Sequence, residues 1–222
     1  MKVFVFVLFS VVLLQSCNYE KVLTAEKRQE IVSELLNIRA VDQRFHGLIP
    51  KELKDRHGPV KAWEIFKRKR DSVNFGHQMR IKELYNAYGY LGEKKVGEEA
   101  AQAFWLVIQH ADNNVDFQQK MLKAMHEEIM YGSQDHYNYA MLEDRINVKL
   151  GKPQRFGSQL TYNERGQAIP KIGLQDSVNI DKLRSEYTLP PFKEYYNEMT
   201  QFHFEMNRQM YQDLGITKPQ LY

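Results

Sequence analysis

The chain has 222 residues, 43% hydrophobic and 27% charged, which is ordinary for a folded protein and argues against disorder over most of its length. Its formal net charge of +3 is too small to indicate nucleic acid binding, so we expect no nucleic acid partner. The length suits one domain with a substantial hydrophobic core.

The first residues have the layout of a secretory signal peptide. Met1-Lys2 gives a positive start, and the apolar run 3–14 is too short to span a bilayer. Leu14-Gln15-Ser16-Cys17 then resembles a bacterial lipobox, in which the cysteine becomes lipidated after cleavage. Cys17 is the single cysteine of the chain, so no disulfide competes for it.

We therefore predict a lipoprotein signal peptide over residues 1–16, a lipidated tether over 17–24 and one domain over 25–222. The membrane would be a partner through the N-terminal lipid. The expected location is the cell envelope, with the protein anchored at the outer membrane or at the periplasmic face.

Helical periodicity follows along most of the mature chain. Thr24 is a plausible N-cap, Gly58-Pro59 separates the first two helices, and Gly151 with Pro153 ends a later one. The predicted helices cover residues 25–46, 60–88, 98–111, 115–131, 136–150, 179–187 and 191–214.

Residues 154–172 have a different pattern, which predicts a β-hairpin. Short apolar runs flank the four-residue turn 163–166, and Pro170 requires an edge position because proline has no amide hydrogen to donate. No alternation of strand and helix suggests a parallel sheet. The sequence thus predicts a mainly α fold, a single helical domain with one inserted β-hairpin.

Several polar residues fall on helix faces that are otherwise apolar. Asp42 continues the stripe of Ile31, Leu35 and Ile38, and Asn74 continues the apolar stripe of the second helix. Gln109 and His110 end the most apolar helix, and Asp144 shares a face with Ala140 and Val148. Buried polar groups are normally paired or used, so these residues indicate a polar pocket or a buried network.

Standard motifs are absent. The segment that starts at Asp112 lacks the glycine and the final glutamate of a calcium loop, and His126 lacks the second histidine of a zinc-protease helix. No phosphate-binding loop or dinucleotide fingerprint occurs. We accordingly predict no metal site and no cofactor.

Residue types suggest one reaction class. His110 could act as a general base that Asp144 orients, while Arg145 and Gln159 hold an anionic or polar group; Gln109, Asp42 and Asn74 would be neighbours. The same residues could instead form a buried structural network, because structural ion pairs imitate functional ones.

Three motifs in order resemble an uncharacterised bacterial family classed as a domain of unknown function. They are a Trp-Leu-x-x-Gln-His-Ala-Asp helix end at 105–112, Asp-Arg at 144–145, and a Tyr-Gly-Thr-Gln turn that reads Phe-Gly-Ser-Gln at 156–159. The likeness extends to Asp71, Asn74, Asp181 and Arg184 and covers about half of the chain. Some members have a lipoprotein leader.

Two positions depart from that family. Phe156 replaces the tyrosine, so a phenol hydroxyl is not essential here, and Gly-Tyr-Leu at 89–91 stands where Gly-Trp-Pro is usual. The resemblance implies a shared site at His110, Asp144, Arg145 and Gln159 but brings no known activity.

Three hypotheses of function follow. One is a lipid-anchored, hydrolase-like enzyme; the second is a non-catalytic binding or accessory lipoprotein for a small polar or envelope-derived ligand. The third is purely structural, with the motifs forming a core network. The sequence leaves open whether the protein is an enzyme.

Overall fold

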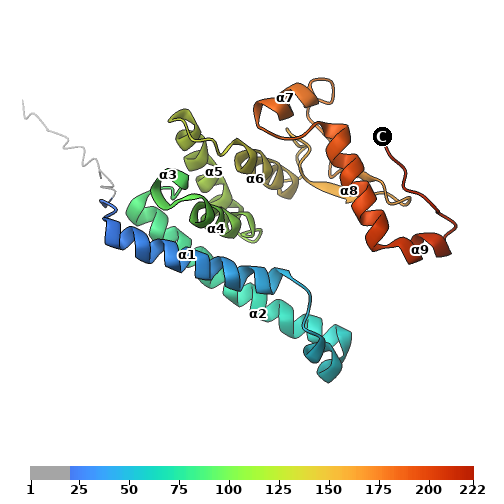
Figure 1. The fold of residues 1–222 in the computed structure, drawn as a ribbon, viewed down its shortest axis with the longest axis horizontal. Coiled ribbons are helices and arrows are strands. Elements are labelled where there is room, and N and C mark those ends of the chain that lie inside the picture. Colours follow the sequence, from blue (N-terminus) through green and yellow to red (C-terminus); the bar gives the residue numbers. More distant parts are fainter. Residues whose placement is uncertain (1–20) are drawn as a thin grey trace, which may run out of the picture.

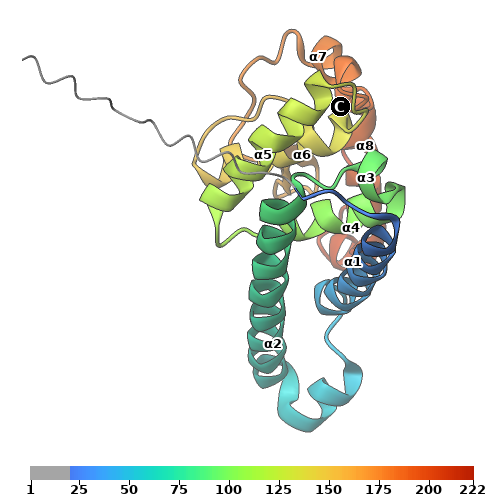
Figure 2. The ribbon, with the colours of Figure 1, turned by 90° about the vertical axis from the view of Figure 1, so that its left-hand side faces the viewer.

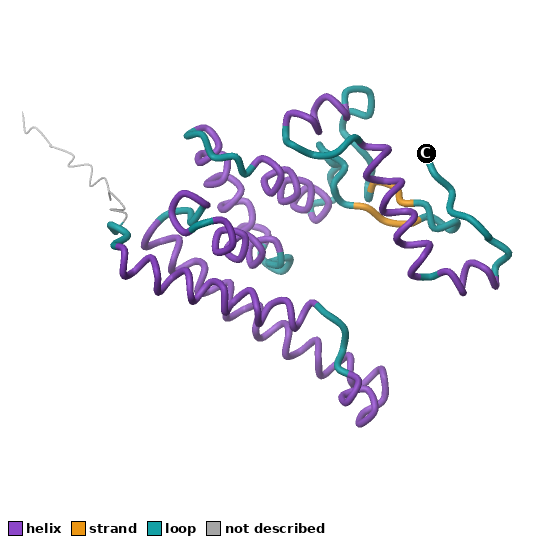
Figure 3. The backbone as a smooth tube through the Cα atoms, viewed as in Figure 1, coloured by secondary structure: helices purple, strands orange, loops and turns teal. Residues whose placement is uncertain are grey.

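The computed structural model describes residues 21–222, so the predicted signal peptide and the lipidation site Cys17 lie outside the described residues. Figures 1 and 3 show that the described part is mainly helical, as predicted, with one small hairpin. Its elements are α1 (Ala25–His46), α2 (Lys51–Tyr88), α3 (Glu93–Val96), α4 (Glu98–Gln109), α5 (Val115–Met130), α6 (His136–Lys149), β1 (Leu160–Tyr162), β2 (Ala168–Pro170), α7 (Ile180–Glu186), α8 (Phe192–Met206) and α9 (Arg208–Asp213).

Helix α1 begins where the sequence predicts. The Thr24 side chain accepts a hydrogen bond from the Lys27 amide, which satisfies one of the free N–H groups of the first turn. The buried face carries Ile31, Leu35 and Ile38 and continues to Asp42. The predicted stripe is therefore real, and it carries a carboxylate into the interior near the end of the helix.

Helix α2 starts earlier than predicted, at Lys51, but the Gly58-Pro59 signal still marks a break. Gly58 has φ 74° and ψ 160°, which is not helical and interrupts the helix. Proline at the following position suits the start of a new helical stretch, because its missing N–H is not needed there. The long arm from Pro59 to Tyr88 runs beside α1 and is joined to it at one end of the molecule (Figure 2).

Helix α4 is the central helix of the main core. It packs against α1, α2, α3, α5 and α6, and its buried side chains include Phe104, Val107 and Ile108. Burying a side chain of this size contributes roughly 1.5–3 kcal/mol, so the sequence AFWLVI alone anchors much of the N-terminal part. This packing fixes the C-terminal end of α4, where His110 lies.

The C-terminal part combines the hairpin with α7, α8 and α9. Strands β1 and β2 pair antiparallel, with Leu160 opposite Pro170, so the proline occupies an edge as required. The Ala168 amide donates to the Thr200 hydroxyl at 2.9 Å and ties the hairpin to α8. The last predicted helix is divided at Asn207, whose side-chain amide donates to the His203 carbonyl oxygen.

None of the helices within residues 21–222 is both long enough and apolar enough to cross a membrane.

Candidate functional site

A cavity of about 720 Å³ opens where α1 and α4 end, beside the middle of α2 and the outer face of α6. We call it the histidine pocket. Its lining is polar throughout: His46, Lys67, Arg70, Asp71, Asn74, His110, Asp112, Asn113, Arg145 and Lys149.

A buried carboxylate holds one histidine of this pocket. Asp42 is 1% exposed, and its two oxygens lie 3.1 and 3.0 Å from Nδ1 of His110. Because an ionised carboxylate only accepts, His110 Nδ1 donates, and Nε2 is left as the basic nitrogen of the ring. His110 follows α4 directly as its C-cap, so the most apolar helix of the chain delivers this histidine to the rim of the core.

A second histidine shares the same carboxylate. His46, the last residue of α1, places Nδ1 3.4 Å from an Asp42 oxygen and 3.1 Å from the Asp42 carbonyl oxygen. Its ring stacks on His110, with ring centroids 3.7 Å apart and planes at 19°. Burial and the neighbouring His110 ring lower the pKa of His46, so this imidazole is neutral at pH 7.

Cationic side chains occupy the facing walls. Arg145 donates two hydrogen bonds to Asp112, each 2.6 Å long, and Lys67 lies 2.9 Å from Asp71. Arg70 and Lys149 also line the cavity, which therefore holds four cations and two paired carboxylates besides Asp42. Burial alone would raise the pKa of Asp112, but the hydrogen bonds and charge of Arg145 hold it below its ordinary value. The walls are thus net positive and suit a small anion.

Two buried polar atoms on α2 have no hydrogen-bond partner within the part of the chain that the structure describes. They are Asn74 Oδ1, on the pocket wall, and Nδ1 of His77, one turn further along the helix. Burial lowers the pKa of His77, and the charge of Asp42 partly opposes this, which places His77 near the same carboxylate. Buried groups of this kind are uncommon and often mark a site that a ligand or water completes.

The pairing of Asp144 with His110 that the sequence suggests is wrong. Asp144 is fully buried and accepts hydrogen bonds from the amides of Arg155, Phe156 and Ser158 at 2.7–3.2 Å. Burial raises the pKa of this carboxyl group, and the amide hydrogen bonds oppose the rise. Asp144 therefore organises the loop before β1, and Asp42 occupies the position beside His110 that the sequence analysis predicts for Asp144.

Gln159 also belongs to that loop rather than to the histidine pocket. Its amide donates to Gln154 Oε1 at 2.7 Å, and its side chain donates to the Ser158 hydroxyl. Arg184, 1% exposed, donates to the carbonyl oxygens of Phe156 and Gly157, so both sides of these peptides are held. The Phe-Gly-Ser-Gln motif is thus a turn whose backbone is held by hydrogen bonds to Asp144 and Arg184.

Gln109 forms a hydrogen bond through its backbone carbonyl oxygen. Its carbonyl oxygen and that of Ile108 accept hydrogen bonds from the buried Gln118 side chain. Of the residues expected at the site, the structure brings His110, Asn74 and Arg145 to one cavity, with Asp42 behind the two histidine rings.

Sequence reasoning missed His46, Lys67, Arg70 and Lys149. A signal for His46 was present, because it stands four residues after Asp42 and such pairs share a helix face. His46 was nevertheless not predicted, because it stands at the end of the helix, where the apolar stripe stops.

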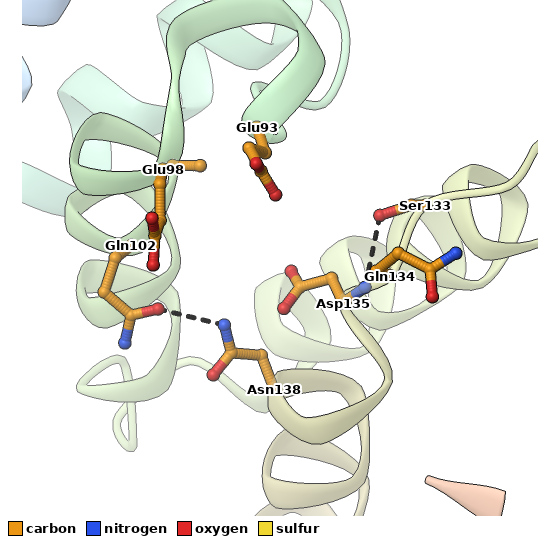
Figure 4. Close-up of a pocket in the computed structure, with 8 residues that line it drawn as sticks. Glu93, Glu98, Gln102, Ser133, Gln134, Asp135 and Asn138 are labelled. Carbon is orange, nitrogen blue, oxygen red and sulfur yellow. Dashed lines mark hydrogen bonds between the residues drawn. The ribbon is translucent and has the colours of Figure 1, made fainter. Parts of the chain in front are cut away.

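A smaller, acidic cavity of about 170 Å³ lies between the start of α4 and the start of α6 (Figure 4). Glu93, Glu98 and Gln102 face Asp135 and Asn138, and the Asn138 amide donates to Gln102 at 3.0 Å. Burial raises the pKa of Asp135 to about 6, against partial compensation by hydrogen bonds from Asn138 and Tyr90. This carboxyl group therefore changes charge near neutral pH.

The fold and the pocket together define a class: a mainly helical protein with a buried carboxylate that holds two histidines at a polar, net cationic cavity. The chain belongs to a family of unknown function, DUF6624, whose model matches residues 31–203. That range contains every residue of the histidine pocket. No curated protein and no solved structure matches the chain.

Proposed function

We propose that this protein is a lipid-anchored envelope protein whose histidine pocket binds a small anionic molecule and hydrolyses it. The observation that carries the proposal is the contact between Asp42 and His110 at a cavity lined by four cations. A histidine oriented by a buried carboxylate is the usual arrangement for a general base.

The chemistry would run through water. Among the residues that line the cavity, none is a serine, threonine, cysteine or tyrosine, so no hydroxyl or thiol nucleophile is present there. His110 Nε2 would take a proton from a water molecule, whose oxygen attacks the substrate's acyl or phosphoryl centre. Asp42 would stabilise the imidazolium, which then returns the proton to the leaving group. Arg145 and Lys149 would hold the substrate's negative charge.

The same absence of a nucleophile favours a second function, binding without chemistry. A cavity with fixed cations and a paired histidine can hold a polar or envelope-derived ligand and release it unchanged. The two functions differ in what His110 does: a base is essential for turnover, whereas a binding residue changes affinity alone.

The test uses the full chain in detergent with a panel of chromogenic phosphate and carboxylate esters. Hydrolysis that disappears in His110→Gln, and persists in His57→Gln at an exposed position of α2, would support catalysis. A panel member that raises the melting temperature of the wild type without being hydrolysed would support the binding function. No hydrolysis and no thermal shift with any member would refute both.

The anchor needs its own experiment. Cys17→Ser should release the protein from the membrane fraction, because a serine cannot receive the thioether-linked lipid. Unchanged membrane association of this variant would refute the lipoprotein assignment.

A further inference from the structure

We propose that Asp42, His46 and His110 form a binding site for one divalent transition-metal ion of the Zn²⁺ class, open to the histidine pocket. It rests on the proposed hydrolysis in the histidine pocket and changes the group that activates the water: with an ion held by Nδ1 of His110, the metal would activate the water in place of Nε2 of His110. It departs from the sequence-based expectation that the chain has no metal site.

Two of the three separations between the donor atoms, those from Asp42, fit one coordination sphere. Each residue offers one ligand atom, and the three atoms lie within 4.8 Å of one another. The Asp42 oxygen is 3.0 Å from His110 Nδ1 and 3.4 Å from His46 Nδ1. Ligands about 2.0–2.1 Å from a Zn²⁺ ion, at tetrahedral or octahedral angles, stand about 2.9–3.4 Å apart. Both Asp42 separations therefore match edges of such a polyhedron.

The histidine rings must tilt apart for the ion to lie in both ring planes, since they are stacked at 19°. His46 has room for this movement. It is the last residue of α1, Gly47 follows it, and its side chain is 26% exposed. His110 is less exposed, at 18%, and Asp42 is fixed in the core, so we expect most of the rotation at His46.

The charge balance around Asp42 also favours a cation. Within residues 21–222, this buried carboxylate pairs with two imidazoles and forms no ion pair with a lysine or arginine. In addition, α1 ends at His46 and α4 ends just before His110, and helix C-termini carry partial negative charge. A carboxylate and two helix C-termini thus converge where a single cation would neutralise them.

Two buried atoms of α2 that have no hydrogen-bond partner within residues 21–222 would supply the outer sphere. Asn74 Oδ1 lies on the same cavity wall, and His77 Nδ1 lies one turn away within the electrostatic range of Asp42. Both atoms can accept hydrogen bonds from metal-bound water, which is how outer-sphere groups tune such sites. A metal with its water would therefore satisfy atoms that the protein alone leaves unpaired.

The donor set selects the ion. Two imidazole nitrogens and one carboxylate oxygen, without a thiolate, suit Zn²⁺ and its neighbours, whereas Ca²⁺ and Mg²⁺ prefer oxygen donors throughout. Three protein ligands leave one position for water, the arrangement of catalytic rather than structural zinc sites. Arg145 and Lys149 then stand where an anionic substrate would meet that water.

The experiment titrates the metal-free full chain with Co²⁺ and with Zn²⁺, with no substrate present. Co²⁺ is followed by its visible absorption and Zn²⁺ by calorimetry. We expect one ion per chain in the wild type and in His57→Gln, and an affinity more than about a hundredfold weaker in Asp42→Asn and in His46→Gln, because even outer-sphere losses cost about 10–100-fold.

His46→Gln keeps the test decisive if Asp42→Asn fails to fold, because His46 is at an exposed helix end. Absence of stoichiometric binding, or binding that His46→Gln leaves unchanged, would overturn the metal site. Metal binding without ester hydrolysis would refute the hydrolytic function alone. Hydrolysis by a metal-free chain would refute the metal's part in activating the water, because His110 would then act as the base.

Discussion

Asp42 and Asp144 are both buried, but their hydrogen-bond partners differ. Both carboxylate oxygens of Asp144 accept hydrogen bonds from backbone amides of the loop that leads into β1. Asp42 meets two imidazole rings, which themselves face a cavity. Burial alone therefore does not identify a functional carboxylate, whereas the nature of its partners does.

The partners differ in what they can do next. Backbone amides do not titrate, and they cannot leave Asp144 without a change in the loop. We therefore assign the Asp144 cluster a structural role. Imidazoles exchange protons, rotate and bind metals, so the Asp42 cluster can enter a reaction. The comparison predicts that substitutions of Asp144 mainly lower stability, whereas substitutions of Asp42 mainly lower function.

The largest effect on stability should come from Asp144→Ala. Three backbone amides would lose their acceptor: the buried amides of Phe156 and Ser158 and the partly buried amide of Arg155. Each orphaned group costs about 1–3 kcal/mol, so we expect a total loss of about 3–5 kcal/mol. Urea unfolding measures this, with Asp116→Ala, at an exposed carboxylate, as the control. A loss below about 1 kcal/mol would remove the structural role.

Asp42→Asn should cost less, about 1–2 kcal/mol, because the amide oxygen can still accept from His110. Function should fall far more, since an amide neither stabilises an imidazolium nor balances a metal ion. The same urea series and the ester panel measure the two effects. If Asp42→Asn lost as much stability as Asp144→Ala and retained hydrolysis, Asp42 would have a structural role like that of Asp144.

Asp135 is an intermediate case, a carboxyl group with too few donors. Its folded pKa of about 6 exceeds the ordinary 3.8, so the folded state binds more protons between these values and stability falls as pH rises from about 4 to 6. Asp135→Asn should therefore gain up to about 3 kcal/mol over the wild type at pH 7.5 and almost nothing at pH 4. Thermal unfolding at both pH values tests this, and an equal gain at both would contradict the assigned titration.

Arg145→Gln should be the mildest change for the fold. Its pair with Asp112 is partly exposed, 27% and 49% for the two side chains, and such pairs contribute about 0–1 kcal/mol. Affinity for an anion should fall about tenfold, because one charge-assisted hydrogen bond is lost. Calorimetry with inorganic phosphate measures it, with Lys193→Gln, at an exposed position of α8, as the matched control. Unchanged affinity would exclude Arg145 from binding.

Most of the helices could be predicted from the sequence, because their apolar periodicity and their terminal residues are local signals. The separate helical turn before Gly58 and the division at Asn207 could not, since no apolar stripe changes there. At the site, Asp42, Asn74 and His110 were recognisable as polar residues on apolar faces. The role of Asp144 was not, because its partners are backbone amides of a loop, and every residue but proline has one.

The length of helix α1 sets the distance between the predicted tether and the histidine pocket. Its 22 residues span about 33 Å, and it joins the segment after Cys17 to His46 at the cavity. If Cys17 carries the predicted lipid, the length of α1 would lie between the tether 17–24 and the cavity. The cavity would then lie about 33 Å along α1 from the end of the tether, so a longer or shorter tether would change how far the cavity can lie from the membrane.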